Sequence, residues 1–243
     1  MKETRLTNIR PAGPIRPRSK YHDNESYALT PGEVAMSRPM LRSFFRELSK
    51  EEKVTFLDDY WTNRFEEHLL MGAANAAYVV ATEPEFLVSA LSTDNDDVLL
   101  LSFSKEIVGP HDLKVGDPLL SVNTYALKEE LTDPDLVDGE NSTGLYGSFY
   151  PLIAQFLSED KNAIRATMLQ LPEEEWVRVE ELTHRRQEQD RFNVRPGNPF
   201  LQMLRSIQQI EPEPGEEDLS LKSLIATVVF ILVVIVWIAL KFS

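Results

Sequence analysis

The feature that most constrains this chain is an uninterrupted apolar segment near its C-terminus. Residues 224–240 are seventeen residues without a charge, and thirteen of them are Leu, Ile, Val or Phe. A helix of this length spans about 25 Å at 1.5 Å per residue, close to the ~30 Å hydrocarbon core of a bilayer. The segment therefore predicts one transmembrane helix, within a tail anchor at residues 221–243.

The composition of this segment is typical of an anchor rather than of an ion pathway, because it contains no charged residue and no Asn, Gln or His. An indole near one end favours the membrane interface, and a following lysine can reach the headgroups. The predicted anchor residues are Leu224, Phe230, Trp237, Leu240 and Lys241. Since residues 1–30 contain no apolar signal segment, we expect a single-pass membrane protein with its N-terminal domain on the cytosolic side.

Charge is distributed unevenly along the chain. The net charge is −14, but residues 1–20 carry +5 and the remainder therefore carries −19. A body this acidic is repelled by phosphate backbones, so nucleic acid is not an expected partner. The absence of cysteine excludes disulfides, thiol nucleophiles and cysteine-ligated metals. We expect the lipid bilayer and other protein subunits as partners, and no cofactor or metal.

The basic segment at residues 1–20 contains three prolines among its arginines, which favours an extended arm. Arginine can form bidentate bonds with carboxylates that lysine cannot. Arg10, Arg16 and Arg18 are therefore the candidate partner-binding residues of the chain.

Several segments carry helix signals. Ser49 to Glu52 form a capping box, and an apolar stripe at helical spacing follows it to about Met71. Caps and prolines predict a short helix over residues 82–91 and further helices over residues 148–157, 159–170 and 172–190, with a last one from Asn198. His184, Arg185 and Arg186 form a cationic patch that we expect to pair with nearby glutamates.

The middle of the chain is harder to interpret. Gly and Pro residues divide residues 105–147 into loops around one helical piece near residues 125–131, and the apolar run at residues 98–101 fits a strand or a helix. The predicted fold is mainly α: a soluble helical domain with a loop-rich middle, room for a short strand pair, and a C-terminal transmembrane helix. The predicted order is an extended arm (1–20), the domain (21–210), an acidic linker (211–220) and the tail anchor (221–243).

Catalytic signatures are scarce. The chain contains no HExxH, no G-x-S-x-G, no P-loop and no G-x-G-x-x-G. The leading hypothesis is a membrane-tethered, non-enzymatic interaction or structural subunit that docks partners or completes a larger membrane assembly. The alternative is a membrane-tethered enzyme with a site in the loop-rich middle, residues 96–147, built from residues such as His111, Asp112 and Glu129. A concave pocket with perturbed carboxylates would favour the enzyme, and a flat exposed apolar patch would favour the subunit.

Overall fold

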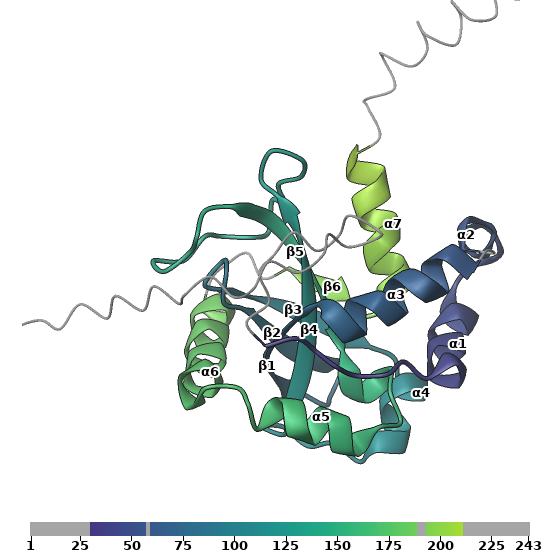
Figure 1. Cartoon of the computed structure of the whole chain (residues 1–243), viewed down its shortest axis with the longest axis horizontal. Coiled ribbons are helices and arrows are strands. Elements are labelled where there is room, and N and C mark those ends of the chain that lie inside the picture. Colours follow the sequence, from purple (N-terminus) through teal and green to yellow (C-terminus); the bar gives the residue numbers. More distant parts are fainter. Residues whose placement is uncertain (1–29, 57–58, 189–192, 211–243) are drawn as a thin grey trace, which may run out of the picture. The chain divides into compact units, whose positions relative to one another are not determined.

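A curled six-stranded sheet, shaped as a half-barrel, forms the centre of the protein (Figure 1). The computed structural model describes residues 30–56, 59–188 and 193–210. By their internal contacts, the residues form two units. One unit ends at Met203 and contains the sheet, and the other begins at Leu204. The strands are β1 (Ala73–Ala81), β2 (Phe86–Ser92), β3 (Asp97–Phe103), β4 (Pro118–Leu127), β5 (Tyr146–Ile153) and β6 (Val194–Pro196).

The strand order is β5-β4-β1-β2-β3-β6. Strands β1, β2 and β3 form an antiparallel meander, and β4 returns to pair with the free side of β1 before β5 pairs with β4. The short β6 is parallel to β3 and closes the other edge. Pro151 lies in the edge strand β5, a position that tolerates a residue without a backbone donor.

Helices precede and follow the strands. The described α-helices are α1 (Arg38–Glu47), α2 (Lys50–Thr55), α3 (Asp59–Met71), α4 (Lys105–Val108), α5 (Lys161–Met168), α6 (Glu173–Gln187) and α7 (Pro199–Ile210), with 3-10 turns η1 (Gly109–His111) and η2 (Ala154–Phe156). The capping box at Ser49 is confirmed, since its side chain accepts from Glu52 N and the Glu52 carboxylate accepts from Ser49 N. Predicted helices are also present at α5, α6 and α7.

The two faces of the sheet are covered differently. Helix α6 packs across β1, β2 and β3, and Ser89 of β2 bonds to Thr183 of α6 at 2.6 Å. Side chains alternate along a strand, so the neighbours of Ser89 point to the other face. There a buried cluster of Ala73, Leu99, Tyr125, Tyr146 and Phe149 fills the interior of the half-barrel.

The prediction of a mainly α fold is wrong, because the centre of the structure is a sheet. The predicted helices over residues 82–91 and 148–157 fall mainly on strands β2 and β5, and the one near residues 125–131 covers the end of β4 and the turn after it. These strands are buried on both faces, so apolar and small residues follow one another without the alternation that marks a half-buried strand. The sequence predicted at most one short strand pair, whereas the sheet has six strands.

The predicted tail anchor at residues 221–243 and the linker at 211–220 lie outside the described residues. Within the described ranges, no helix combines the length and the apolar character needed to cross a bilayer. The structure therefore does not bear out a mainly α, single-pass, tail-anchored chain, since what it describes is a half-barrel domain without such a helix.

Candidate functional site

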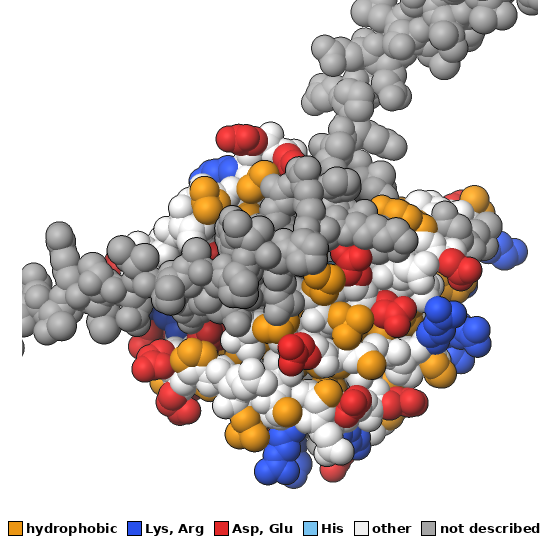
Figure 2. Space-filling view, viewed as in Figure 1, with side chains coloured by type: hydrophobic (Ala, Val, Ile, Leu, Met, Phe, Trp, Pro, Cys, Tyr) orange, Lys and Arg blue, Asp and Glu red, His pale blue; other side chains and the backbone are white. Residues whose placement is uncertain are grey.

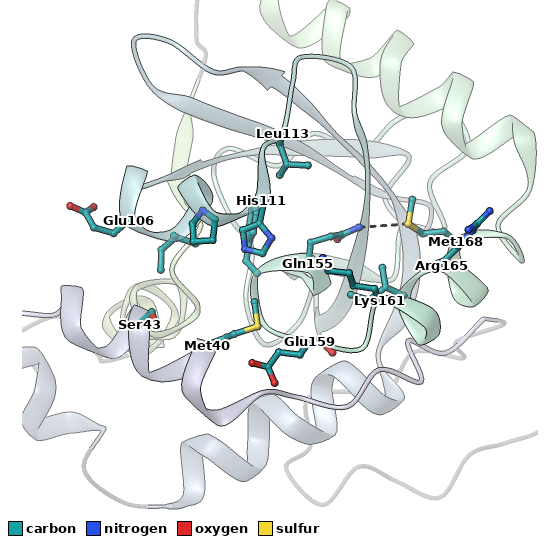
Figure 3. A pocket seen from close by; sticks show the side chains of 15 residues that line it. Met40, Ser43, Glu106, His111, Leu113, Gln155, Glu159, Lys161, Arg165 and Met168 are labelled. Atoms are coloured by element: carbon teal, nitrogen blue, oxygen red, sulfur yellow. Dashed lines mark hydrogen bonds between the residues drawn. The ribbon is translucent and has the colours of Figure 1, made fainter.

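A hollow of about 560 Å³ opens between α1, the α4–η1 segment, η2 and α5 (Figure 3). Its walls are largely apolar and include Met40, Ile107, Phe156 and Ile164. His111 of η1 lies in the middle of this view, and we call the hollow the His111 pocket. Its volume falls within the range of about 300–1,000 Å³ that is usual for small-molecule sites.

The polar side chains that line the His111 pocket include donors as well as two carboxylates. Burial lowers the pKa of His111, and the positive charge of Lys161 lowers it further, so the imidazole is neutral at pH 7. The ring packs edge-on against Phe156 at 5.1 Å between centroids. Gln155 accepts a hydrogen bond from Leu120 N at 3.1 Å through its carbonyl oxygen, while its amide nitrogen contacts only the sulfur of Met168, at 3.6 Å, among the described residues.

A second hollow, of about 510 Å³, lies between α5 and α6 and is called here the α5–α6 groove. Its lining residues are uncharged apart from one arginine and one glutamate: Tyr78, Gly116, Pro118, Arg165, Met168, Leu169, Trp176, Val179 and Glu180. Leu169 is 77% exposed, and Val177, beside Trp176 in sequence, is 51% exposed. On the face drawn in Figure 2, hydrophobic side chains reach the surface where α5 and α6 meet.

Helix α5 separates the two hollows, because Arg165 and Met168 line both of them. Within the part of the chain that the structure describes, Arg165 has no carboxylate within ion-pair distance. Figure 2 shows Lys and Arg side chains at the surface over α5. The helix therefore presents unneutralised positive charge between two largely apolar hollows.

The carboxylates with shifted pKa values are not in either hollow. Burial raises the pKa of Asp97, and its bidentate bonds with Arg186 only partly oppose this. Burial also acts to raise the pKa of Asp96, but Arg178 and Asn141 outweigh it and lower the pKa. Because both carboxylates are held by arginines of α6, neither is available as a general acid or base.

A third arginine, Arg195, completes this network and is buried. Arg195 of β6 bonds to Asp135 through both Nε and Nη2, and its Nη2 also lies 3.0 Å from Asp133. Burial alone would lower the pKa of Arg195, but the two aspartates raise it. The three pairs tie the β2–β3 turn and residues 133–135 to α6 and β6, so their role is structural.

His68 of α3 is a buried core residue rather than a site residue. Its Nε2 lies 2.8 Å from the Val122 carbonyl oxygen, and its Nδ1 lies 3.4 Å from the Thr124 hydroxyl. Burial lowers the pKa of His68 to about 3. The imidazole is therefore neutral at any physiological pH and donates to a carbonyl in the interior.

The residues of the predicted enzyme alternative do not come together. His111 and the exposed Asp112 precede β4, whereas the exposed Glu129 follows it. The ten residues of β4 separate the two ends by about 33 Å at 3.3 Å per residue. Of the three, His111 lines a pocket.

The other predicted site residues cannot be placed. Arg10, Arg16 and Arg18, as well as Leu224, Phe230, Trp237, Leu240 and Lys241, lie outside the described residues. Metal binding finds no support within residues 30–56, 59–188 and 193–210, where no three His, Asp or Glu side chains are grouped as a metal site would require.

Sequence reasoning missed the α5–α6 groove. Trp176 is half-buried in the structure and lines the groove. The available signal was the strongly apolar Leu169 at the end of a helix whose other exposed residues are mostly polar, but one exposed leucine is common on protein surfaces.

No known family model, curated protein or solved structure matches this chain.

Proposed function

We propose that this chain is a membrane-tethered, non-enzymatic interaction subunit that docks a partner protein through the α5–α6 groove. The observation that carries the docking part is the groove itself, an apolar hollow with Leu169 77% exposed at its edge. Exposed apolar hollows with a polar rim are typical of protein-binding surfaces. The membrane part rests on the sequence of residues 221–243 alone.

The groove favours one kind of occupant, an amphipathic helix of the partner. Two helices border it, and a hollow of this type receives the apolar stripe of a third helix. Arg165 lies on the α5 side and Glu180 on the α6 side. Charge complementarity therefore favours a helix with an acidic residue on the side that faces α5 and a basic residue on the side that faces α6.

Replacing Leu169 by Asp should weaken partner binding about tenfold or more, because a docked partner would cover this side chain, and covering a carboxylate that has no cation costs more than ~1.4 kcal/mol. The melting temperature should change by no more than about 2 °C, since the side chain is largely exposed. The partner is first identified by a photo-crosslinking residue placed at position 169 of the full chain, and its crosslinked segment is then titrated as a peptide.

Val54 provides the matched control, because it is 67% exposed on α2 and does not line the groove. Crosslinking from position 54 should not capture the same segment, and Val54→Asp should leave its affinity unchanged. Equal affinity of the Leu169→Asp and Val54→Asp variants for the crosslinked segment would refute docking at this groove.

A further inference from the structure

The His111 pocket holds hydrogen-bond donors that the proposed docking does not use. Lys161 of α5 and His111 of η1 face the same hollow, and Gln155 of η2 lies beside them (Figure 3). Within the described residues, neither Lys161 nor His111 has a side-chain hydrogen bond or an ion pair. Unused donors around a hollow of ligand size indicate an acceptor-bearing ligand.

We propose that the His111 pocket binds a small monocarboxylate with an apolar body, its carboxylate held by Lys161, His111 and Gln155. A carboxylate accepts from all three groups: the ammonium of Lys161, the amide nitrogen of Gln155 and an imidazole N–H of His111. Bonds from the ammonium to the carboxylate are charge-assisted, and these are stronger than bonds between neutral groups.

The position of Lys161 relative to His111 favours binding of an anionic rather than a cationic ligand group between the two side chains. The two groups are close enough for the lysine charge to disfavour protonation of the imidazole. A carboxylate between them would neutralise this charge, whereas a cationic group would add to the repulsion.

The acidic residues of the pocket do not oppose an anion strongly. Glu106 and Glu159 are both exposed, as Lys161 is, so solvent screens all three charges. Figure 3 shows the Glu106 carboxylate at the edge of the pocket and directed away from His111. The position beside His111 is thus bordered by Lys161 and Gln155, while the Glu106 carboxylate lies at the edge of the pocket.

The remainder of the hollow determines the body of the ligand. Met40, Ile107, Phe156 and Ile164 supply an apolar wall from four separate elements. Each methylene buried there contributes about 0.8 kcal/mol by the usual transfer scale, so an aliphatic or aromatic body is favoured over a polar one. A sugar or a nucleotide would leave its hydroxyl groups without partners on this wall.

The test uses three probes of nearly equal shape on the full chain: 4-phenylbutyrate, the neutral 4-phenylbutanamide and the cationic 4-phenylbutylamine. Binding is followed by the NMR signals of labelled histidine, with the His111 signal assigned from the His111→Gln variant. We expect a saturable shift of the His111 signal with the carboxylate, and binding at least about tenfold weaker for the amide and the amine.

Lys161→Met should weaken binding of 4-phenylbutyrate about tenfold and leave binding of the amide unchanged, because it removes the charge and keeps the apolar stem. Lys50→Met on α2, an exposed lysine away from the pocket, is the matched control and should bind as the unmodified chain does. Met40→Trp should abolish binding of every probe by filling the hollow.

The proposal fails if the amide binds as tightly as the carboxylate, if Lys161→Met and Lys50→Met behave alike, or if no probe gives a saturable shift. It is independent of the docking proposal, because Leu169 does not line this pocket. Leu169→Asp should therefore leave 4-phenylbutyrate binding unchanged, and Lys161→Met should leave peptide docking unchanged.

Discussion

Replacing Arg195 by Leu should lower the free energy of unfolding by about 3–5 kcal/mol, because it leaves the carboxylates of Asp133 and Asp135 buried without their cation. Side chains of all three residues are at most 4% exposed. Removing one partner of a buried ion pair costs far more folding free energy than removing one partner of an exposed pair. Urea unfolding at pH 7, followed by tryptophan fluorescence, would measure the effect.

Lys105 provides the comparison for this prediction. It forms an ion pair with Glu83 at 3.1 Å, but the two side chains are 75% and 72% exposed. Lys105→Leu should therefore change the stability by less than about 1 kcal/mol. Adding Asp133→Asn and Asp135→Asn to Arg195→Leu should recover part of the loss, because it removes the uncompensated charges. If Arg195→Leu and Lys105→Leu lower the free energy of unfolding equally, burial of the ion pairs does not determine how much they stabilise the protein.

Acidification should destabilise the protein through His68. The pKa of this residue is about 3 in the folded protein and about 6.5 in the unfolded chain. The unfolded state therefore binds more protons below pH 6.5, and stability falls as pH falls from 6.5 toward 3. The loss is about 1.4 kcal/mol per pH unit, or about 2 kcal/mol between pH 6.5 and pH 5. Above pH 6.5 this contribution is constant.

The effect of His68 is separated from other titrating groups by His68→Gln, whose amide stays neutral and can still donate to the Val122 carbonyl oxygen. The variant should lose stability between pH 6.5 and pH 5 by about 2 kcal/mol less than the unmodified chain does. His111 also has a lowered pKa, but it titrates in both proteins and cancels in the difference. Parallel stability curves for the two proteins over this range would show that His68 is not held neutral.

The two hollows suggest how one small domain could combine two binding events. Arg165 and Met168 line both the His111 pocket and the α5–α6 groove, and Met168 contacts Gln155 of the pocket. A pocket ligand and a docked partner would therefore contact opposite sides of the same helix, α5. Each is tested by its own variant, Lys161→Met or Leu169→Asp, so the two events can be measured separately.

The fold could be predicted from the sequence where local chemistry is sufficient. A capping box at Ser49, Pro172 before α6 and Asn198 before α7 marked real helix starts, because a cap acts within a few residues of the backbone groups that it satisfies. The continuous stripe expected to run from residue 49 to Met71 is interrupted, since α2 ends at Thr55 and α3 begins at Asp59. Local signals place starts better than ends.

The sheet could not be predicted in the same way. Strand β1 is mostly alanine, and β4 and β5 are buried on both faces, so none of them alternates between apolar and polar residues. Gly72, next to β1, shows the tertiary cause: a Cβ there would lie 2.8 Å from the carbonyl oxygen of Asn123 in β4. The small residues of this segment therefore lie close to the neighbouring strand β4.

The sites depend on tertiary structure even more strongly. Arg186 was expected to pair with glutamates nearby in sequence, yet its partner is Asp97, 89 residues away. The His111 pocket and the α5–α6 groove likewise bring together segments from distant parts of the chain. What the sequence by itself determined was local: helix caps, the uneven charge, the absence of thiol chemistry and the uncharged apolar segment at 224–240. Which residues meet was decided by the tertiary structure, because pairing of strands and helices far apart in sequence depends on the burial of whole faces rather than on any local pattern.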